Sequence, residues 1–489
     1  MDPFDCDLAV RGPNGGFNGD LPRDIRKVAR LMASRPPKSG SRTGSGPEGK
    51  SGFRPVEHPV RASGQRERGP DPLGTPARRA AIRLLDAVLR RGEPLESALA
   101  AATRALPGGP DRGLAHAIAA ETLRRLPDLD ALIDSATPRP LPDDAKARFA
   151  LRIALVQVLA LGTPPHAAIA TVLPLVDGGP RKLVHGVFGT LMRGEVSLEE
   201  IPTLPAATGL RWQTSWGDQM VEDAARAFSA PPPLDLGLSD WDQTDRLLGE
   251  TGGDSLAPGH VRVSDHGAVT DMPGFRDGDW WVQDVAASIP ARLIGRNPGH
   301  VLDLCAAPGG KTMQLAAMGA TVTAVDASES RLKRLRDNLK RTALEATVIR
   351  ADVLEWQPEG QADAVLIDAP CSATGIYRRH PDVLYRVRPS IIAEMADLQA
   401  RILARAADWV KPGGILVYAT CSLEPQEGEH QAEAFLIERR DFKIVPPAAG
   451  VLPDGITAST RGWVRTLPGM LAERGGCDGF FVAAMRREG

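Results

Sequence analysis

Two cysteines occupy positions where a reactive thiol could do chemistry. Cys371 stands in the segment Asp368–Ser372 (DAPCS) and Cys421 in Ala419–Leu423 (ATCSL), and each segment directly follows a short apolar run. If the two runs are neighbouring parallel strands, both thiols lie over one cleft at the carboxyl end of a sheet. A free thiol is a weak nucleophile at neutral pH until its surroundings favour the thiolate. Two thiols in one cleft therefore indicate thiol chemistry, unless both are buried packing residues.

A third segment, Asp303–Thr312 (DLCAAPGGKT), also follows an apolar run and begins a helical stretch. Its adjacent glycines allow close approach of a ligand, but its spacing is neither the dinucleotide GxGxxG pattern nor the triphosphate GxxxxGK[ST] pattern. Asp326 and Asp352 follow the next two apolar runs, where carboxylates suit a ribose diol and an adenine edge. We expect a nucleoside ligand across three strand ends. The loop residues expected to contact it are Cys305 (a small spacer), Ala306, Ala307, Pro308, Gly309, Gly310 and Lys311.

The elements that must position these residues follow from the pattern after residue 299. Short apolar, partly β-branched runs alternate there with helical stretches, which predicts a mostly parallel, doubly wound α/β sheet covered on both faces. The segment 479–485 comes late enough to add an antiparallel last strand. The predicted strands are 301–304, 320–325, 347–349, 364–367 and 415–419.

The chain upstream divides into three further parts. Residues 75–200 have apolar residues at helical spacing with breaks at prolines and glycines, which predicts an all-α bundle. Residues 201–285 read as a connecting subdomain with short strands at 260–263 and 280–282, so the sheet domain covers 286–489. Residues 1–74 are rich in Gly, Ser, Pro and basic residues and are predicted to be disordered. This tail is either a plain solvated extension or a basic segment that holds RNA phosphates.

Composition excludes several classes of protein. Lys and Arg total 59 against 61 Asp and Glu, a net charge of −2, so the surface is not basic throughout. Five scattered cysteines with no CxxC pair argue against a disulfide framework and a zinc site. No apolar run is long enough to span a membrane, and the acidic start lacks the order of a signal peptide. We expect a cytoplasmic monomer without a metal ion or a membrane partner.

Three of these segments together resemble a known family. DLCAAPGGKT (303–312), DAPCSATGIYRRHPD (368–382) and YATCSLEPQEGE (418–429) look like the motifs of the RsmB/Sun (Fmu) family of RNA cytosine-5 methyltransferases. The resemblance runs from about 278 to 487, and the helical residues 76–195 are similar to the NusB-like RNA-binding domain of the bacterial rRNA member.

The flanking motifs and two departures complete the comparison with that family. Trp281–Asp284 (WVQD) and Asp478–Phe481 (DGFF) also match. Ala373 stands where the family usually has Gly, and Gly428 where it usually has Asn. The second departure concerns the loop after Cys421 and not the reaction itself.

The resemblance implies a class I (Rossmann-like) methyltransferase fold, S-adenosylmethionine as cofactor and RNA as substrate, with small-subunit rRNA favoured over tRNA. It implies that Cys421 attacks carbon 6 of a cytosine, that Cys371 assists release and that Asp368 hydrogen-bonds the base edge while also belonging to the cofactor site. The segment Arg378–Pro381 is expected to meet RNA phosphates or the target strand. His380 within it is either a general base or a plain surface histidine.

Three other functions fit the sequence less well. Amino-group methyltransferases place Pro-Pro and an aromatic residue after the fourth strand, whereas Cys371 follows Pro370 here. DNA cytosine-5 enzymes use the Pro-Cys thiol as nucleophile, which leaves Cys421 without a role. A non-catalytic RNA-binding factor would need no intact cofactor loop and no Thr-Cys motif, yet the chain has both.

Overall fold

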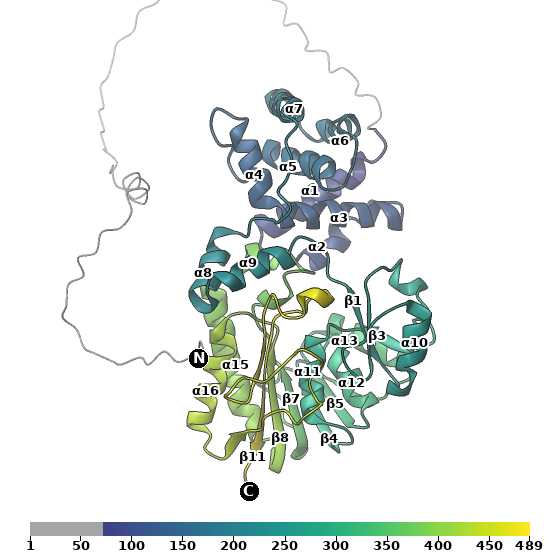
Figure 1. Ribbon diagram of the computed structural model, residues 1–489, viewed down its shortest axis with the longest axis vertical. Helices are drawn as coiled ribbons and strands as arrows, with labels where there is room; N and C mark the ends of the chain where they lie inside the picture. The colour runs from purple at the N-terminus through teal and green to yellow at the C-terminus, as the bar shows by residue number, and fades with distance from the viewer. Residues whose placement is uncertain (1–71) are drawn as a thin grey trace, which may run out of the picture. The chain divides into compact units, whose positions relative to one another are not determined.

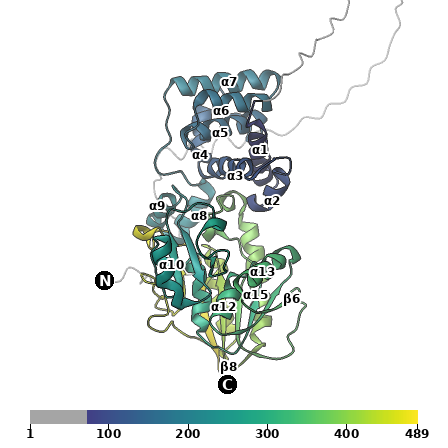
Figure 2. The ribbon, with the colours of Figure 1, turned by 90° about the vertical axis from the view of Figure 1, so that its right-hand side faces the viewer.

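The computed structural model describes residues 72–489, so the predicted tail lies outside the described residues except for its last three positions. Helices form the first part of the described chain (Figures 1 and 2). Helix α2 was not predicted, because it is short, half of its eight residues are alanine, and it carries little periodicity. The bundle helices are α1 (Thr75–Leu89), α2 (Leu95–Ala102), α3 (Gly109–Arg124), α4 (Leu126–Ser135), α5 (Lys146–Leu159), α6 (Pro165–Val172) and α7 (Gly178–Arg193).

The bundle has one apolar core. In α1, Pro76 lies in the first turn, where a proline costs no hydrogen bond. Leu84, Leu85 and Val88 then recur on one face and are all buried. Helix α5 is buried along most of its length and lies between the other helices. The period of the apolar residues therefore placed most of these helices correctly.

A small antiparallel sheet follows the bundle. Its strands pair in the order β2 (His260–Val263), β1 (Leu234–Leu238), β3 (Trp280–Val282). Strand β1 was not predicted, because it comes directly after Pro231–Pro233, which read as a turn signal. The helices of this part are α8 (Ala206–Trp216), α9 (Asp218–Ala227) and α10 (Thr244–Thr251).

In the described part of the chain, eight strands form the main sheet, in the order β10-β11-β8-β7-β4-β5-β6 with β9 paired to β11. Strands β4 to β8 pair in parallel and β11 runs antiparallel to β8, so the predicted fold class is confirmed. Strands β9 and β10, each three residues long, were not predicted. The strands are β4 (His300–Leu304), β5 (Thr321–Asp326), β6 (Thr347–Arg350), β7 (Ala362–Asp368), β8 (Val410–Thr420), β9 (Phe442–Ile444), β10 (Val464–Thr466) and β11 (Phe480–Arg487).

Helices cover both faces of the main sheet (Figure 1). Alternate residues of β7 point to opposite faces: Val365 and Ile367 pack with α15 and α16, whereas Ala364 and Leu366 pack with α11 and α12. Because both sets are buried, the strand reads as a continuous apolar run. The helices are α11 (Ile289–Ile294), α12 (Gly310–Ala317), α13 (Glu329–Thr342), α14 (Val383–Arg386), α15 (Pro389–Ala407) and α16 (Glu429–Glu438).

The helical bundle contacts the segment that follows Cys371. The Arg124 guanidinium donates to the carbonyl of Arg378 at 3.1 Å, and the Tyr385 hydroxyl donates to the carbonyl of Leu123 at 2.7 Å. The backbone N–H of Leu95 donates to Asp382 at 3.3 Å. These contacts cross the predicted boundaries at 200 and 285, which stay predictions.

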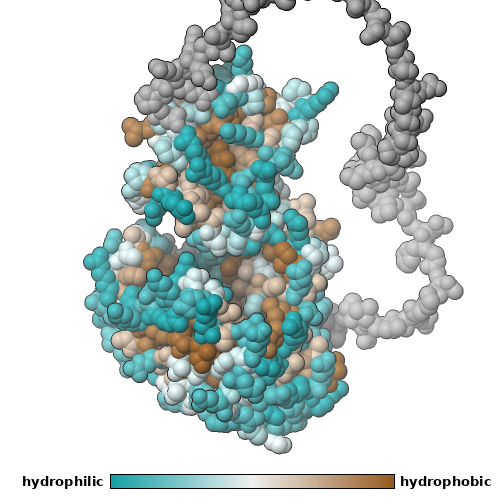
Figure 3. Space-filling view, turned by 180° about the vertical axis from the view of Figure 1, so that it is seen from behind, coloured by the Kyte–Doolittle hydropathy of each residue, from teal (hydrophilic) through white to brown (hydrophobic). Residues whose placement is uncertain are grey.

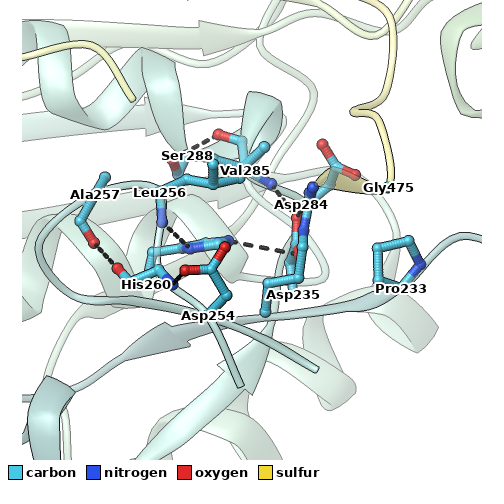
Figure 4. A network of polar contacts seen from close by, with 12 residues as sticks. Pro233, Asp235, Asp254, Leu256, Ala257, His260, Asp284, Val285, Ser288 and Gly475 are labelled. Carbon is cyan, nitrogen blue, oxygen red and sulfur yellow. Dashed lines mark hydrogen bonds and ion pairs between the residues drawn. The ribbon is translucent and has the colours of Figure 1, made fainter. Parts of the chain in front are cut away.

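A buried ion cluster joins the small sheet to the main domain (Figure 4). The carboxylate of Asp235 accepts two hydrogen bonds from Arg262, each 2.7 Å, and one from the backbone N–H of Val285 at 2.8 Å. Burial raises the pKa of Asp235, but its hydrogen bonds with Arg262 and its contact with His260 at 3.5 Å outweigh burial and hold that pKa below its usual range. The carboxylate therefore stays ionised and fixes the small sheet against the start of the Rossmann-like domain.

No membrane span is found among the described residues. None of their helices has both the length and the apolar character needed to cross a membrane. On the face shown in Figure 3, hydrophilic side chains alternate with smaller hydrophobic areas. Among residues 72–489, no group of His, Cys, Asp or Glu is arranged to hold a metal ion.

Candidate active site

The two cysteines meet at the edge of the sheet. Strands β7 and β8 are parallel neighbours, with Asp368 opposite Ala419. The Sγ atoms of Cys371 and Cys421 lie 3.4 Å apart. The hydrogen bond with Cys421 and burial both raise the pKa of the Cys371 thiol well above its ordinary value. The two thiols are therefore within hydrogen-bond distance of each other, and either sulfur can be the donor.

A lysine and a carboxylate from the predicted set pair beside the cysteines. Lys311 Nζ lies 2.8 Å from Asp368 Oδ2, and the lysine side chain is buried. Burial lowers the pKa of Lys311, but Asp368 and, to a smaller extent, Cys421 raise it, and the net shift is upward. The ammonium group is thus a fixed positive charge next to the thiols.

The predicted ligand loop joins β4 to α12. Gly309 has φ 106°, a left-handed conformation that favours glycine. A Cβ there would lie 2.9 Å from Leu335 Cγ, so packing against α13 also requires glycine, whereas Gly310 has no neighbour within 3.7 Å of its Cβ position. Burial raises the pKa of Cys305 above its ordinary value, which fits a spacer and not a nucleophile.

Two of the predicted carboxylates differ in exposure. Asp326, at the end of β5, is buried and accepts hydrogen bonds from the backbone N–H groups of Ala307 at 3.1 Å and Ser328 at 2.8 Å. Asp352 is exposed and accepts from the backbone N–H of Leu354 at 2.8 Å. Asp326 therefore holds the ligand loop in shape, and each carboxylate retains lone pairs for a ligand.

Sequence reasoning missed Asp303, which lies in β4 below the loop. Its Oδ2 accepts from the Thr312 hydroxyl at 2.6 Å, and its Oδ1 is buried without a partner among the described residues. Burial raises the pKa of Asp303 to about 7, and the negative charge of Asp368 adds to the effect. The sequence shows that Asp303 lies one residue before the end of a predicted strand, but it does not show that the side chain is fully buried.

The raised pKa of Asp303 predicts how the free energy of unfolding depends on pH. An unfolded Asp titrates near pH 4, so between pH 4 and 7 the folded chain keeps a proton that the unfolded chain has lost. Stability from this group is present below pH 4 and lost as pH rises to 7. Asp303→Asn should therefore gain about 2–4 kcal/mol relative to the wild type between pH 5 and pH 8. Urea unfolding at both pH values measures the difference, and an equal difference at both would contradict the assignment.

The expectation that Arg378 and Arg379 meet RNA phosphates is wrong for Arg378 and unsupported for Arg379. The Arg378 guanidinium is buried, 3.2 Å from Asp478 and 3.5 Å from Asp284. Arg379 donates to Asp284 at 2.9 Å. Both arginines thus bind the loop after Cys371 to the flanking motifs Trp281–Asp284 and Asp478–Phe481. His380 in the same loop is half-buried, and burial lowers its pKa.

The two departures from the family pattern have structural consequences. Ala373 has φ 58°, the left-handed region that glycine adopts without strain, which explains why glycine is usual there. At Gly428 a Cβ would lie 2.3 Å from Arg465 Nη2 and 2.9 Å from Phe481 Cγ. In this chain the loop after Cys421 therefore accommodates glycine and excludes a larger residue.

Comparison with known proteins gives consistent relatives. Residues 291–486 match the family described as 16S rRNA methyltransferase RsmB/F, and residues 75–189 match the NusB family. A Ribosomal RNA small subunit methyltransferase B of Klebsiella pneumoniae is 34% identical over 438 residues, covering 83% of this chain and 97% of that protein. The protein of the same name from Salmonella arizonae is 35% identical over 434 residues, covering 83% and 98%.

A solved structure supports the fold. The chain named PH0851 superposes with a TM-score of 0.65 at 24% identity, covering 84% of this chain and 99% of that one. The curated relatives are matched over nearly their full length, through both the helical and the sheet domains. The chain therefore belongs to the RsmB/F family of 16S rRNA methyltransferases.

Proposed function

We propose that the chain methylates carbon 5 of a cytosine in small-subunit ribosomal RNA through a covalent bond between Cys421 and carbon 6 of the base. The observation that carries the proposal is the pair of sulfur atoms 3.4 Å apart at the ends of two neighbouring strands. A buried lysine–carboxylate pair lies beside them. The names of the relatives support the choice of RNA.

The residues present fit S-adenosylmethionine as the cofactor. When bound, it supplies a methyl group on a positively charged sulfur. Asp326 and Asp368 lie close enough to Asp303 to raise its pKa, while Lys311 is the neighbouring cation. This excess of negative charge suits a cationic ligand. The open space at Gly310 leaves room beside the loop backbone.

The chain's own groups would carry out the remaining steps. Attack by Cys421 on carbon 6 makes carbon 5 a nucleophile, which divides one difficult reaction into easier ones. Lys311 stabilises the thiolate before attack, and Asp368 hydrogen-bonds the base edge and favours protonation of the ring nitrogen during attack. After methylation, the carbon 5 proton passes to water, and its electron pair forms the double bond between carbons 5 and 6. The Cys421–carbon bond breaks in the same step, and Cys371 assists the departure of the Cys421 sulfur.

Cofactor binding should depend on Asp326. Asp326→Ala removes a carboxylate proposed to take the ribose hydroxyls and leaves the N–H groups of Ala307 and Ser328 without their acceptor. One such loss costs about 1–3 kcal/mol, or roughly 5- to 150-fold in affinity. Calorimetry with S-adenosylmethionine measures the change, and Asp337→Ala, an exposed carboxylate on α13, is the control. Unchanged affinity in a folded Asp326→Ala protein would remove Asp326 from the site.

The reaction itself is tested by mass spectrometry of RNA. Purified protein, S-adenosylmethionine and small-subunit rRNA lacking the modification should yield 5-methylcytosine at one position. A methyl group on an exocyclic nitrogen or on ribose would refute the proposal. We also propose that the protein acts in the cytoplasm, where ribosomal RNA is processed in bacteria.

A further inference from the structure

A buried carboxylate joins the two loops that carry the cysteines. Glu427 lies in the turn between β8 and α16 and is fully buried. Its Oε1 accepts from the backbone N–H of Ser372 at 2.8 Å and from Gln399 at 3.2 Å. Its Oε2 accepts from the hydroxyls of Ser372 and Ser422. Ser372 directly follows Cys371 and Ser422 directly follows Cys421, so one side chain holds the neighbours of both thiols.

The backbone of Glu427 is fixed as firmly as its side chain. Its carbonyl accepts from the Tyr418 hydroxyl at 2.6 Å and lies 3.3 Å from the Thr420 hydroxyl. Arg465 and Phe481 close the space at the next residue, Gly428. The carboxylate is therefore held pointing toward Ser372 and Ser422.

A buried charge needs a reason, because burial of a carboxylate is costly unless it is fully hydrogen-bonded. Burial raises the pKa of Glu427, and its hydrogen bonds with Ser372 and Ser422 act in the opposite direction. Two serines could be buried without a charge by bonding to each other, since their hydroxyls already lie 3.1 Å apart. What the carboxylate adds is a single rigid acceptor shared by two loops.

We propose that Glu427 is a positioning residue that holds Cys371 and Cys421 side by side by binding Ser372 and Ser422. This inference rests on the proposed function and deepens it. A misplacement of about 1 Å in a reacting group costs on the order of 100-fold in rate, so small shifts of either loop matter. Glu427 also contributes to the raised pKa of Cys371, after the Cys421 hydrogen bond and burial.

Three variants test the role. Glu427→Ala removes the link, whereas Glu427→Gln keeps the shape, and its amide can donate to hydroxyls that accept as well as donate. Glu433→Ala, a partly exposed carboxylate on α16, is the matched control. The first readout is the yield of the Cys371–Cys421 disulfide after diamide treatment, mapped by peptide mass spectrometry. It reports thiol proximity without requiring activity. The others are the single-turnover rate of methyl transfer and the affinity for S-adenosylmethionine.

Glu427→Ala is expected to lower the single-turnover rate by roughly 100-fold and to reduce the disulfide yield, with cofactor affinity unchanged. Glu427→Gln should restore most of both. If Glu427→Ala does not fold, Ser422→Ala removes one end of the link and should lower the disulfide yield.

If Glu427→Ala keeps both the single-turnover rate and the disulfide yield of the wild-type protein, the proposal is overturned. An equal loss of rate and cofactor affinity in the Ala and Gln variants would also overturn it, because that pattern indicates a folding role only. If the wild-type protein makes no 5-methylcytosine, the proposed function fails. The disulfide yield then still decides whether Glu427 holds the thiols together.

Discussion

Cys421→Ala is expected to abolish methyl transfer to RNA and to prevent any covalent protein–RNA complex. The change removes the sulfur that attacks carbon 6 and leaves Cys371 as the one thiol of the described cleft, with a pKa raised well above its ordinary value. Removal of a covalent nucleophile lowers turnover by roughly 10⁴-fold or more. Transfer of labelled methyl groups to rRNA measures the rate, and denaturing electrophoresis detects the complex.

Cys477→Ala is the matched control for this variant. Cys477 is a buried thiol outside the cleft, whose pKa burial raises above its ordinary value. The control should retain activity, and Cys421→Ala should still bind S-adenosylmethionine because Cys421 lies outside the proposed ligand loop. Substantial methyl transfer by Cys421→Ala would exclude Cys421 as the nucleophile.

The sequence was sufficient to place the strand-end residues. Asp326, Asp368 and Cys421 each follow or end an apolar run, and the carboxyl ends of parallel strands meet along one edge of a sheet. The sequence left one condition open, which was whether the strands before Cys371 and Cys421 are neighbours. The pairing of β7 with β8 settles it.

Partners far apart in the chain could not be predicted in the same way. Arg378 binds Asp284 and Asp478, which are 94 and 100 residues away. Nothing local to an arginine pair in a loop distinguishes a buried ion pair from a phosphate contact, and the latter was expected. The role of Glu427 could not be predicted for the same reason, because its partner Ser372 lies 55 residues away in the chain.

The helical bundle illustrates a third limit. Apolar periodicity identified its helices, but periodicity describes the face that a helix buries within its own domain. The bundle also supplies Leu123 and Arg124 as partners for Tyr385 and for the Arg378 backbone, in the segment that follows Cys371. The bundle and the loop that carries Cys371 are therefore linked through direct contacts.

Cys371→Ala is expected to produce the opposite defect from Cys421→Ala. Attack by Cys421 and methyl transfer remain possible, but the thiol 3.4 Å from the attacking sulfur is gone. Departure of Cys421 from the methylated base should slow, so the protein–RNA complex should accumulate. In the presence of S-adenosylmethionine it should survive denaturing electrophoresis as a slowly migrating band that ribonuclease removes.

The double variant Cys371→Ala/Cys421→Ala is the decisive control, because it should lose the band that the single variant accumulates. Position alone does not rank the two thiols, since both lie at the same edge of the sheet. The choice of Cys421 as the attacking thiol follows the family resemblance of its Thr-Cys motif, and these variants test it directly. Trapping by Cys421→Ala and not by Cys371→Ala would reverse the roles, as in the DNA enzymes. If neither variant traps RNA and both remain active, the reaction does not pass through a cysteine adduct.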